Sequence, residues 1–146
     1  MATKVFTGGE TGVRGTPPTY YRRRRCVVDS LSTATNGVNI GANDVVEAID
    51  VAVSDVVMLV VLEVLTVEAG AMTIDVGDGT DVDGYIDGAN GNSSGAIYTA
   101  PACTLYTAAD TVDMKYLSAA DACKIGLVVS YTNMDVDVTT GTKQVS

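Results

Sequence analysis

The residue types that most often carry chemistry in proteins are few in this chain, and one is missing. The 146 residues include no histidine, which removes the usual general base, the base of a catalytic triad and a common zinc ligand. Cys26, Cys103 and Cys123 have no Cys-x-x-Cys spacing and no histidine to complete a metal site. Their strand-like surroundings supply neither the cation nor the helix N-terminus that activates a thiol. We therefore expect no enzymatic activity, no cofactor, and reduced, mostly buried thiols.

An acidic, glycine-rich segment over residues 77–88 is the second candidate for chemistry. Carboxylates at alternate positions are oxygen donors of the kind that Ca²⁺ prefers. However, an EF-hand loop needs a ligand at its fifth position, and counting from Asp81 that position is Tyr85. Asp and Gly are also the favoured residues of turns between strands, and we prefer this interpretation to a metal site. The weak candidates for calcium ligands are Asp78, Asp81, Asp83 and Asp87.

The sharpest local feature is a run of four arginines preceded by two tyrosines. Arg binds a carboxylate or a phosphate through paired hydrogen bonds, and both Tyr and Arg are enriched at interface anchors. We therefore expect the run to contact a partner, and a solvated charge run leading into the first strand is the alternative. The partner-binding candidates are Tyr20, Tyr21, Arg22, Arg23, Arg24 and Arg25.

Charge is distributed unevenly along the chain. Residues 1–25 carry six basic side chains and one acidic one, a sum of +5, and the remaining residues carry three basic and 17 acidic ones, a sum of −14. A body this acidic repels a phosphate backbone. The charge thus argues against nucleic acid as a partner and favours protein carboxylates as the target of the arginines. Four glycines and Pro17–Pro18 indicate an extended basic arm over residues 1–25, followed by one domain over residues 26–146.

The elements that must position these residues are predicted to be strands, because apolar and polar residues alternate with period 2. Residues 56–67 are longer and almost fully apolar, which suits the centre of a sandwich or a subunit contact. Within residues 123–138 the apolar residues occupy mostly odd-numbered positions up to Tyr131 and even-numbered positions from Met134 onward. A bulge or tight turn at Thr132–Asn133 would return the second half to the core. The expected strands are 26–28, 49–54, 56–67, 72–76, 85–86, 96–98, 112–116 and 123–138.

This strand content predicts an all-β fold, an antiparallel β-sandwich of the jelly-roll or Greek-key kind that follows the arm. The longest purely apolar run, residues 56–62, is far shorter than the roughly 20 residues that a bilayer span needs, so no membrane partner is expected. The first residues do not resemble a signal peptide, which favours synthesis and assembly in a cytoplasm.

Three strand-and-turn segments carry a resemblance to a known class of proteins. They are residues 42–51, 73–81 and 105–113. Over residues 42–138 the chain resembles capsid decoration (cement) proteins, small structural proteins of tailed-bacteriophage virions. The resemblance implies a β-sandwich that oligomerises, often as a homotrimer, on the capsid surface and ties major capsid proteins together. It assigns no individual functional residue, and the arm lies outside the matched stretch.

Two other function classes stay open. Another virion component, such as a head fibre, a tail component or a coat subunit, would use the same sandwich, and a coat lining a genome would bind nucleic acid with a steep salt dependence. A carbohydrate-binding module with a calcium loop is the third class. Its usual stacking aromatics are scarce here, at 5% of the residues.

Overall fold

The computed structural model describes residues 5–7, 22–30 and 39–135. Within these ranges the regular elements are strands, and no helix has the length and apolar character that a membrane crossing requires. The strands are β1 (Val5–Thr7), β2 (Arg22–Asp29), β3 (Val45–Val51), β4 (Asp55–Thr66), β5 (Thr73–Asp78), β6 (Ile86–Asn90), β7 (Ile97–Leu105), β8 (Asp110–Tyr116) and β9 (Lys124–Asn133).

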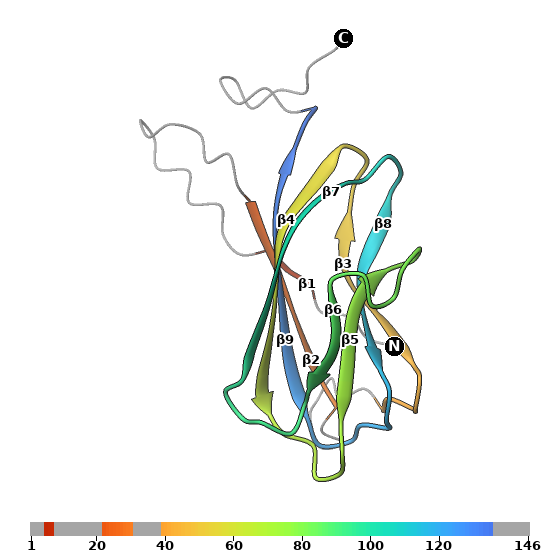
Figure 1. Cartoon of the computed structure of the whole chain (residues 1–146), viewed down its shortest axis with the longest axis vertical. Helices are drawn as coiled ribbons and strands as arrows, with labels where there is room; N and C mark the ends of the chain where they lie inside the picture. Colours follow the sequence, from red (N-terminus) through yellow and green to blue (C-terminus); the bar gives the residue numbers. More distant parts are fainter. Residues whose placement is uncertain (1–4, 8–21, 31–38, 136–146) are drawn as a thin grey trace.

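Two antiparallel sheets pack face to face as a sandwich (Figure 1). One has the order β1-β2-β9-β4-β7 and the other the order β3-β8-β5-β6. Four strand pairs are nested along the chain: β2–β9 encloses β3–β8, which encloses β4–β7, which encloses β5–β6. This is the arrangement of one long antiparallel hairpin rolled into a jelly roll, with β1 added at an edge. The predicted all-β sandwich is confirmed.

The apolar residues of β4 serve both faces of their sheet because successive side chains of a strand alternate between the faces, and a bulge changes the phase of this alternation. Val57 is buried, and the next fully buried residues are Val60 and Leu62. The register shifts between Val57 and Leu59, and one extra residue exchanges the two faces of a strand. Half of the apolar run therefore lies in the core, and the other half lies on the outside of the five-stranded sheet.

Several strand boundaries differ from the prediction. The strand expected at residues 49–54 spans Val45–Val51, and Val53 lies in the turn that follows it and is 46% exposed. The strand expected at residues 26–28 begins at Arg22, which places the arginines inside the sheet. The strand expected at residues 96–98 continues to Leu105. The last strand ends at Asn133, and Met134 lies in a turn and is 66% exposed, so the expected return to the core is wrong at this residue. The rest of the predicted arm, apart from β1, lies outside the described residues.

The three cysteines are free thiols, and two of them are buried. Cys26 and Cys123 lie in the core, whereas Cys103 is exposed on β7. Burial raises the pKa of the Cys123 thiol, although the Ser30 hydroxyl, 3.2 Å from its Sγ, lowers it in part. A raised pKa keeps this thiol protonated and disfavours it as a nucleophile.

Candidate interaction surface

Strand alternation divides the four arginines into two pairs. In β2, Arg23 and Arg25 are exposed, whereas Arg22 and Arg24 are partly buried and share the side of the buried Cys26. The cause is local, since successive side chains of a strand point to opposite faces of the sheet. Pairing with β9 fixes which pair faces inward. Tyr20 and Tyr21 lie outside the described residues.

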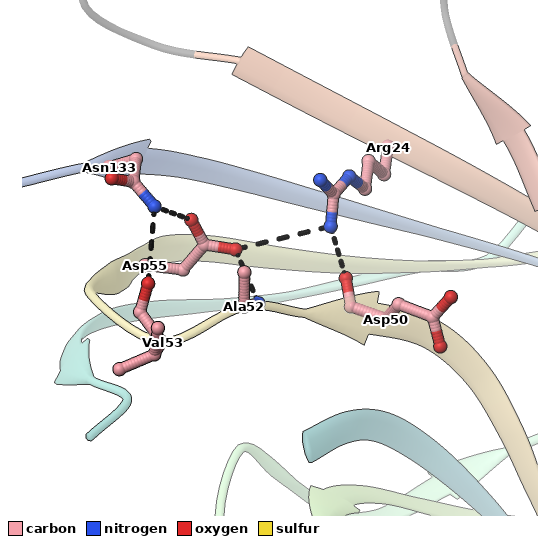
Figure 2. A network of polar contacts seen from close by, with 6 residues as sticks. All are labelled: Arg24, Asp50, Ala52, Val53, Asp55 and Asn133. Carbon is pink, nitrogen blue, oxygen red and sulfur yellow. Dashed lines mark hydrogen bonds and ion pairs between the residues drawn. The ribbon is translucent and has the colours of Figure 1, made fainter. Parts of the chain in front are cut away.

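Arg24 is engaged within the fold, where it bridges the two sheets (Figure 2). Its Nη1 donates a hydrogen bond to the backbone carbonyl of Asp50 and lies 3.9 Å from Oδ2 of Asp55. The guanidinium also lies over the ring of Tyr131, 4.6 Å from its centroid, in the geometry of a cation–π contact. Arg24 thus joins β2 to residues of β3, β4 and β9.

Asp55 is the buried anion at the centre of this network. Only 1% of the residue is exposed. Its Oδ2 accepts a hydrogen bond from the Ala52 backbone N–H at 2.8 Å, and its Oδ1 accepts one from Asn133 Nδ2 at 2.7 Å (Figure 2). A buried carboxylate needs such partners to offset the loss of hydration. Arg24 was predicted to bind a partner together with Arg22, Arg23 and Arg25, but in the structure it has this internal role.

The outward side of β2, β9, β4 and β7, here called the outer face, carries Arg23 and Arg25 beside a mostly apolar surface. The strand register orders its residues in rows that run across the four strands. The rows, in the order β2, β9, β4 and β7, are Arg23, Ser130, Leu59 and Pro101; then Arg25, Val128, Val61 and Thr99; then Val27, Gly126, Glu63 and Ile97.

The apolar part of the outer face reaches the sheet edge at β7. Ile97 is 61% exposed and Leu105 is 56% exposed, and both lie on this edge strand. In the row next to that of Ile97, Val61 and Val128 are only partly buried by their own chain. Exposed apolar side chains that form one continuous surface are typical of protein interfaces. Pro101 lacks an N–H donor and weakens β7 as an edge for strand addition, so a partner would pack on the face.

Gly126 leaves a space on the outer face that Leu65 and Arg25 border. A Cβ placed on Gly126 would lie 3.6 Å from Cδ1 of Leu65, 3.7 Å from Nη2 of Arg25 and 3.9 Å from Cβ of Glu63. The guanidinium therefore lies over the strand next to its own and close to the row that contains Glu63. Within the described residues, neither Arg23 nor Arg25 forms a hydrogen bond or an ion pair that would hold it in the fold.

The outward side of the second sheet has the opposite charge. Glu47 pairs in register with Asp113, which is 5% exposed and whose Oδ1 has no hydrogen-bond partner within the described residues. Burial is the main cause that raises the pKa of Asp113 to about 6; the Thr111 side chain lowers it through a hydrogen bond, and the charges of Glu47, Asp110 and Asp78 raise it further. This face therefore attracts cations and holds one carboxyl group that titrates near neutral pH.

The aspartates of the weak calcium candidate shape a turn. Oδ1 of Asp78 accepts the backbone N–H groups of Thr80 and Asp81 at 2.9 Å, and its Oδ2 accepts the Tyr106 hydroxyl at 2.9 Å. Asp83 raises the pKa of Asp81 through a side-chain hydrogen bond, and Asp87 is exposed. No group of three or more potential ligands gathers for a metal within the described ranges. The hydrogen bonds of Asp78 support the turn interpretation.

The outer face could not be predicted from the sequence, because its residues come from four separate strands. The alternation of exposed and buried arginines follows from the period of a strand and could have been predicted once Arg22 was included in β2. The proximity of Arg25, Gly126 and Glu63 depends on long-range register, for which a single sequence holds no signal.

Comparisons with known proteins find similarity in structure only. No protein-family model and no curated protein sequence matches the chain. A chain of the acid-stable capsid of Helicobacter pylori bacteriophage KHP30 superposes with a TM-score of 0.59 and 15% identity, over 79% of this chain and 89% of that one. A chain of the Ralstonia phage GP4 capsid gives 0.58 and 19%, over 84% and 92%. A chain of the cyanophage Pam1 capsid asymmetric unit gives 0.60 and 18%, over 82% and 88%. At these identities the similarity establishes a shared fold.

Proposed function

We propose that this chain is a structural, non-enzymatic protein of a bacteriophage virion, which binds the head shell from outside as a decoration (cement) protein. The observation that carries the proposal is the fold, which covers most of the chain and most of three chains from phage capsid structures. The absence of histidine fits a structural role. The partner in this proposal is the major capsid protein, and the location is the capsid surface of a virion assembled in the host cytoplasm.

The proposed contact with the shell is electrostatic and centres on Arg23. This residue is exposed near the N-terminal end of β2, within the stretch predicted as the arm, and Tyr20 and Tyr21 precede it in the sequence. Arg23 is not held by an ion pair within the described residues, so its guanidinium is available to fork a carboxylate of a partner. The acidic second sheet would face away from the shell in this arrangement.

The test is co-sedimentation with heads that were assembled from the major capsid protein without this chain. We expect the wild-type chain to saturate the heads and to protect them against heat or mechanical rupture. Failure of the wild-type chain to bind would contradict the decoration role. Binding to tails or fibres instead would leave a virion role of another kind.

A charge reversal at Arg23 tests the proposed contact within that assay. Arg23→Glu should weaken binding to the heads by about tenfold or more, since it turns an attractive pair into a repulsive one. Lys115→Glu makes the same change on the outward side of the other sheet and serves as the matched control. Equal binding by both variants would show that β2 does not face the shell.

The salt dependence of binding distinguishes a protein partner from a nucleic-acid partner. A coat subunit that lines nucleic acid would bind DNA or RNA with an affinity that falls steeply as salt rises. We expect no such binding, because residues 26–146 carry a charge of −14. Tight, salt-sensitive DNA binding by the wild-type chain would favour a coat subunit over a decoration protein.

A further inference from the structure

We propose that the outer face is a contact between two copies of this chain, related by a two-fold axis that runs parallel to the strands between β9 and β4. The inference concerns the chain free in solution. Because Arg23 lies in the same outer face, binding to the shell through Arg23, as proposed above, would replace this contact. It is carried by the row order of the outer face, by the position of Arg25 over Gly126, and by the exposed apolar residues at β7.

The outer face is large enough for a stable contact. Four strands at about 4.8 Å spacing and eight residues at about 3.4 Å rise cover about 500 Å² in projection. The rough surface of the side chains is larger than this projection, and the share of one partner in a standard interface is about 800 Å². In the three rows only Arg23, Arg25 and Glu63 carry charge. The next outward row within this area adds Asp29 and Lys124, which pair with each other at 3.2 Å.

The proposed axis determines which strands meet. Rotation by 180° about a line between β9 and β4 places β9 of one copy on β4 of the other, and β2 on β7. Each row keeps its position along the strands, so that it meets the same row of the second copy in reverse order. Sheets that pack face to face in this aligned manner lie about 10 Å apart, and their side chains interdigitate.

Apolar residues then meet apolar residues. Val128 meets Val61 of the second copy, and Val61 meets Val128, because a two-fold contact is reciprocal. In the neighbouring row, Val27 meets Ile97 of the second copy and covers a side chain that is 61% exposed in the single chain. The contact therefore buries the most exposed apolar residue of the face.

The charges are complementary across the same axis. Gly126 meets Glu63 of the second copy, and the guanidinium of Arg25 lies over Gly126. Arg25 is thus directed at the carboxylate of Glu63, and symmetry forms this pair twice. The alternative axis, in the plane of the face but perpendicular to the strands, would place β2 against β2 and bring Arg23 and Arg25 of both copies together. That arrangement is repulsive.

A two-fold contact also differs from the homotrimer that the resemblance implied. A trimer uses two different surfaces of each subunit, whereas a two-fold contact uses one self-complementary surface. The outer face is complementary to itself. We therefore expect dimers of twice 15.1 kDa rather than trimers when the chain is free in solution.

The first experiment measures the mass and the dissociation constant of the full chain by light scattering and sedimentation velocity, under reducing conditions because Cys103 is exposed. Val61→Lys should raise the dissociation constant at least about tenfold, since it places two like charges at the centre of the contact. Val45→Lys is the matched control: Val45 is also a partly buried, outward valine, but it lies on β3 of the other sheet. Circular dichroism confirms that both variants are folded.

The second experiment exchanges the charges of the proposed pair. Arg25→Glu and Glu63→Arg should each weaken the dimer, and the double variant should recover most of the affinity because the pair is restored with opposite polarity. The proposal is overturned by a wild-type chain that is monomeric at about 100 μM or trimeric, by a Val61→Lys variant as dimeric as Val45→Lys, or by charge reversals that leave the dimer unchanged.

Discussion

Single residues of identical type have different roles here because a strand presents its side chains to two environments. Arg24 faces the inside of the sandwich, where it meets Asp55, whereas Arg23 and Arg25 face outward. The same separation applies to carboxylates. Asp55 has a cation and two hydrogen-bond donors, whereas Asp113 is buried beside Glu47 with one oxygen unpaired.

Replacement of Arg24 tests its internal role. Arg24→Ala should lower the free energy of unfolding by about 1–3 kcal/mol, because it leaves the buried Asp55 without its cation and removes the contact with Tyr131. The measurement is urea denaturation followed by far-UV circular dichroism. Arg23→Ala is the control and should change stability by less than about 0.5 kcal/mol, as surface substitutions do. Equal losses in the two variants would contradict the assignment.

Asp113 predicts a pH dependence of stability. Burial raises its pKa to about 6 in the folded state, so the folded chain binds more protons than the unfolded chain between that pKa and the lower one of an exposed Asp. Stability should therefore rise as pH falls from 7.5 to 5. Asp113→Asn should be more stable than wild type at pH 7.5, by about 1 kcal/mol after allowance for solvent screening.

The measurement that checks the role of Asp113 is the difference in stability between the wild type and Asp113→Asn as a function of pH. Thermal unfolding at pH 5, 6, 7 and 8 should show that the advantage of Asp113→Asn shrinks towards pH 5. Glu68 acts in the opposite direction at lower pH: burial by itself raises its pKa, but backbone N–H donors of Ala122, Asp121 and Ala69 lower it overall. An advantage that stays constant over the whole range would exclude Asp113 as the titrating group.

At the scale of elements, the β5–β6 loop is held on the outward side of its sheet by a glycine. A Cβ on Gly77 would overlap the backbone of Asp81 and Val82, closer than any real Cβ contact. The backbone N–H of Asp78 donates to the carbonyl of Asp81 at 2.9 Å and fixes the turn. The loop therefore packs directly on β5, and this packing contributes to the burial of Asp113, whose register partner on β5 is Gly77.

Gly77→Ala should destabilise the fold by about 2 kcal/mol or more, because the methyl group has to displace backbone rather than a flexible side chain. Gly70→Ala provides the matched control, since nothing lies within 4 Å of a Cβ at that position. Both variants are compared by urea denaturation. A Gly77→Ala variant as stable as Gly70→Ala would show that the loop does not pack on β5 in this way.

At the scale of the whole molecule, the sandwich is closed by contacts between distant parts of the chain. The β2–β9 ladder pairs Arg22 with Tyr131, and β3 pairs with β8. Such pairs form only after large loops have closed, at a cost in chain entropy. The nested order of the jelly roll means that its innermost hairpin, β5–β6, is the most local, and each further pair encloses a longer stretch of chain.

This topology predicts slow folding for a chain of 146 residues. Refolding after dilution from urea, followed by tyrosine fluorescence in a stopped-flow instrument, should take milliseconds to seconds, as for other β-sandwiches. A double-jump experiment separates any slower phase that comes from isomerisation of the three prolines. A main phase faster than about 1 ms would contradict the expectation.

The β class, most of the strands and the scarcity of groups for catalysis follow from the amino-acid sequence alone. These are local properties, since residues near each other in the chain set both the period of alternation and the turn chemistry of Asp78. The sequence also placed the basic run of Arg22–Arg25, but it did not distinguish the members of that run.

The use of those elements depends on how the strands pack in three dimensions. The bulge between Val57 and Leu59 determines which half of β4 lies outward, and pairing with β9 determines that Arg24 points inward. The outer face joins Arg25, Gly126 and Glu63 from three strands. Long-range register depends on the packing of all strands at once, and a period-2 pattern is compatible with either face until that packing selects one.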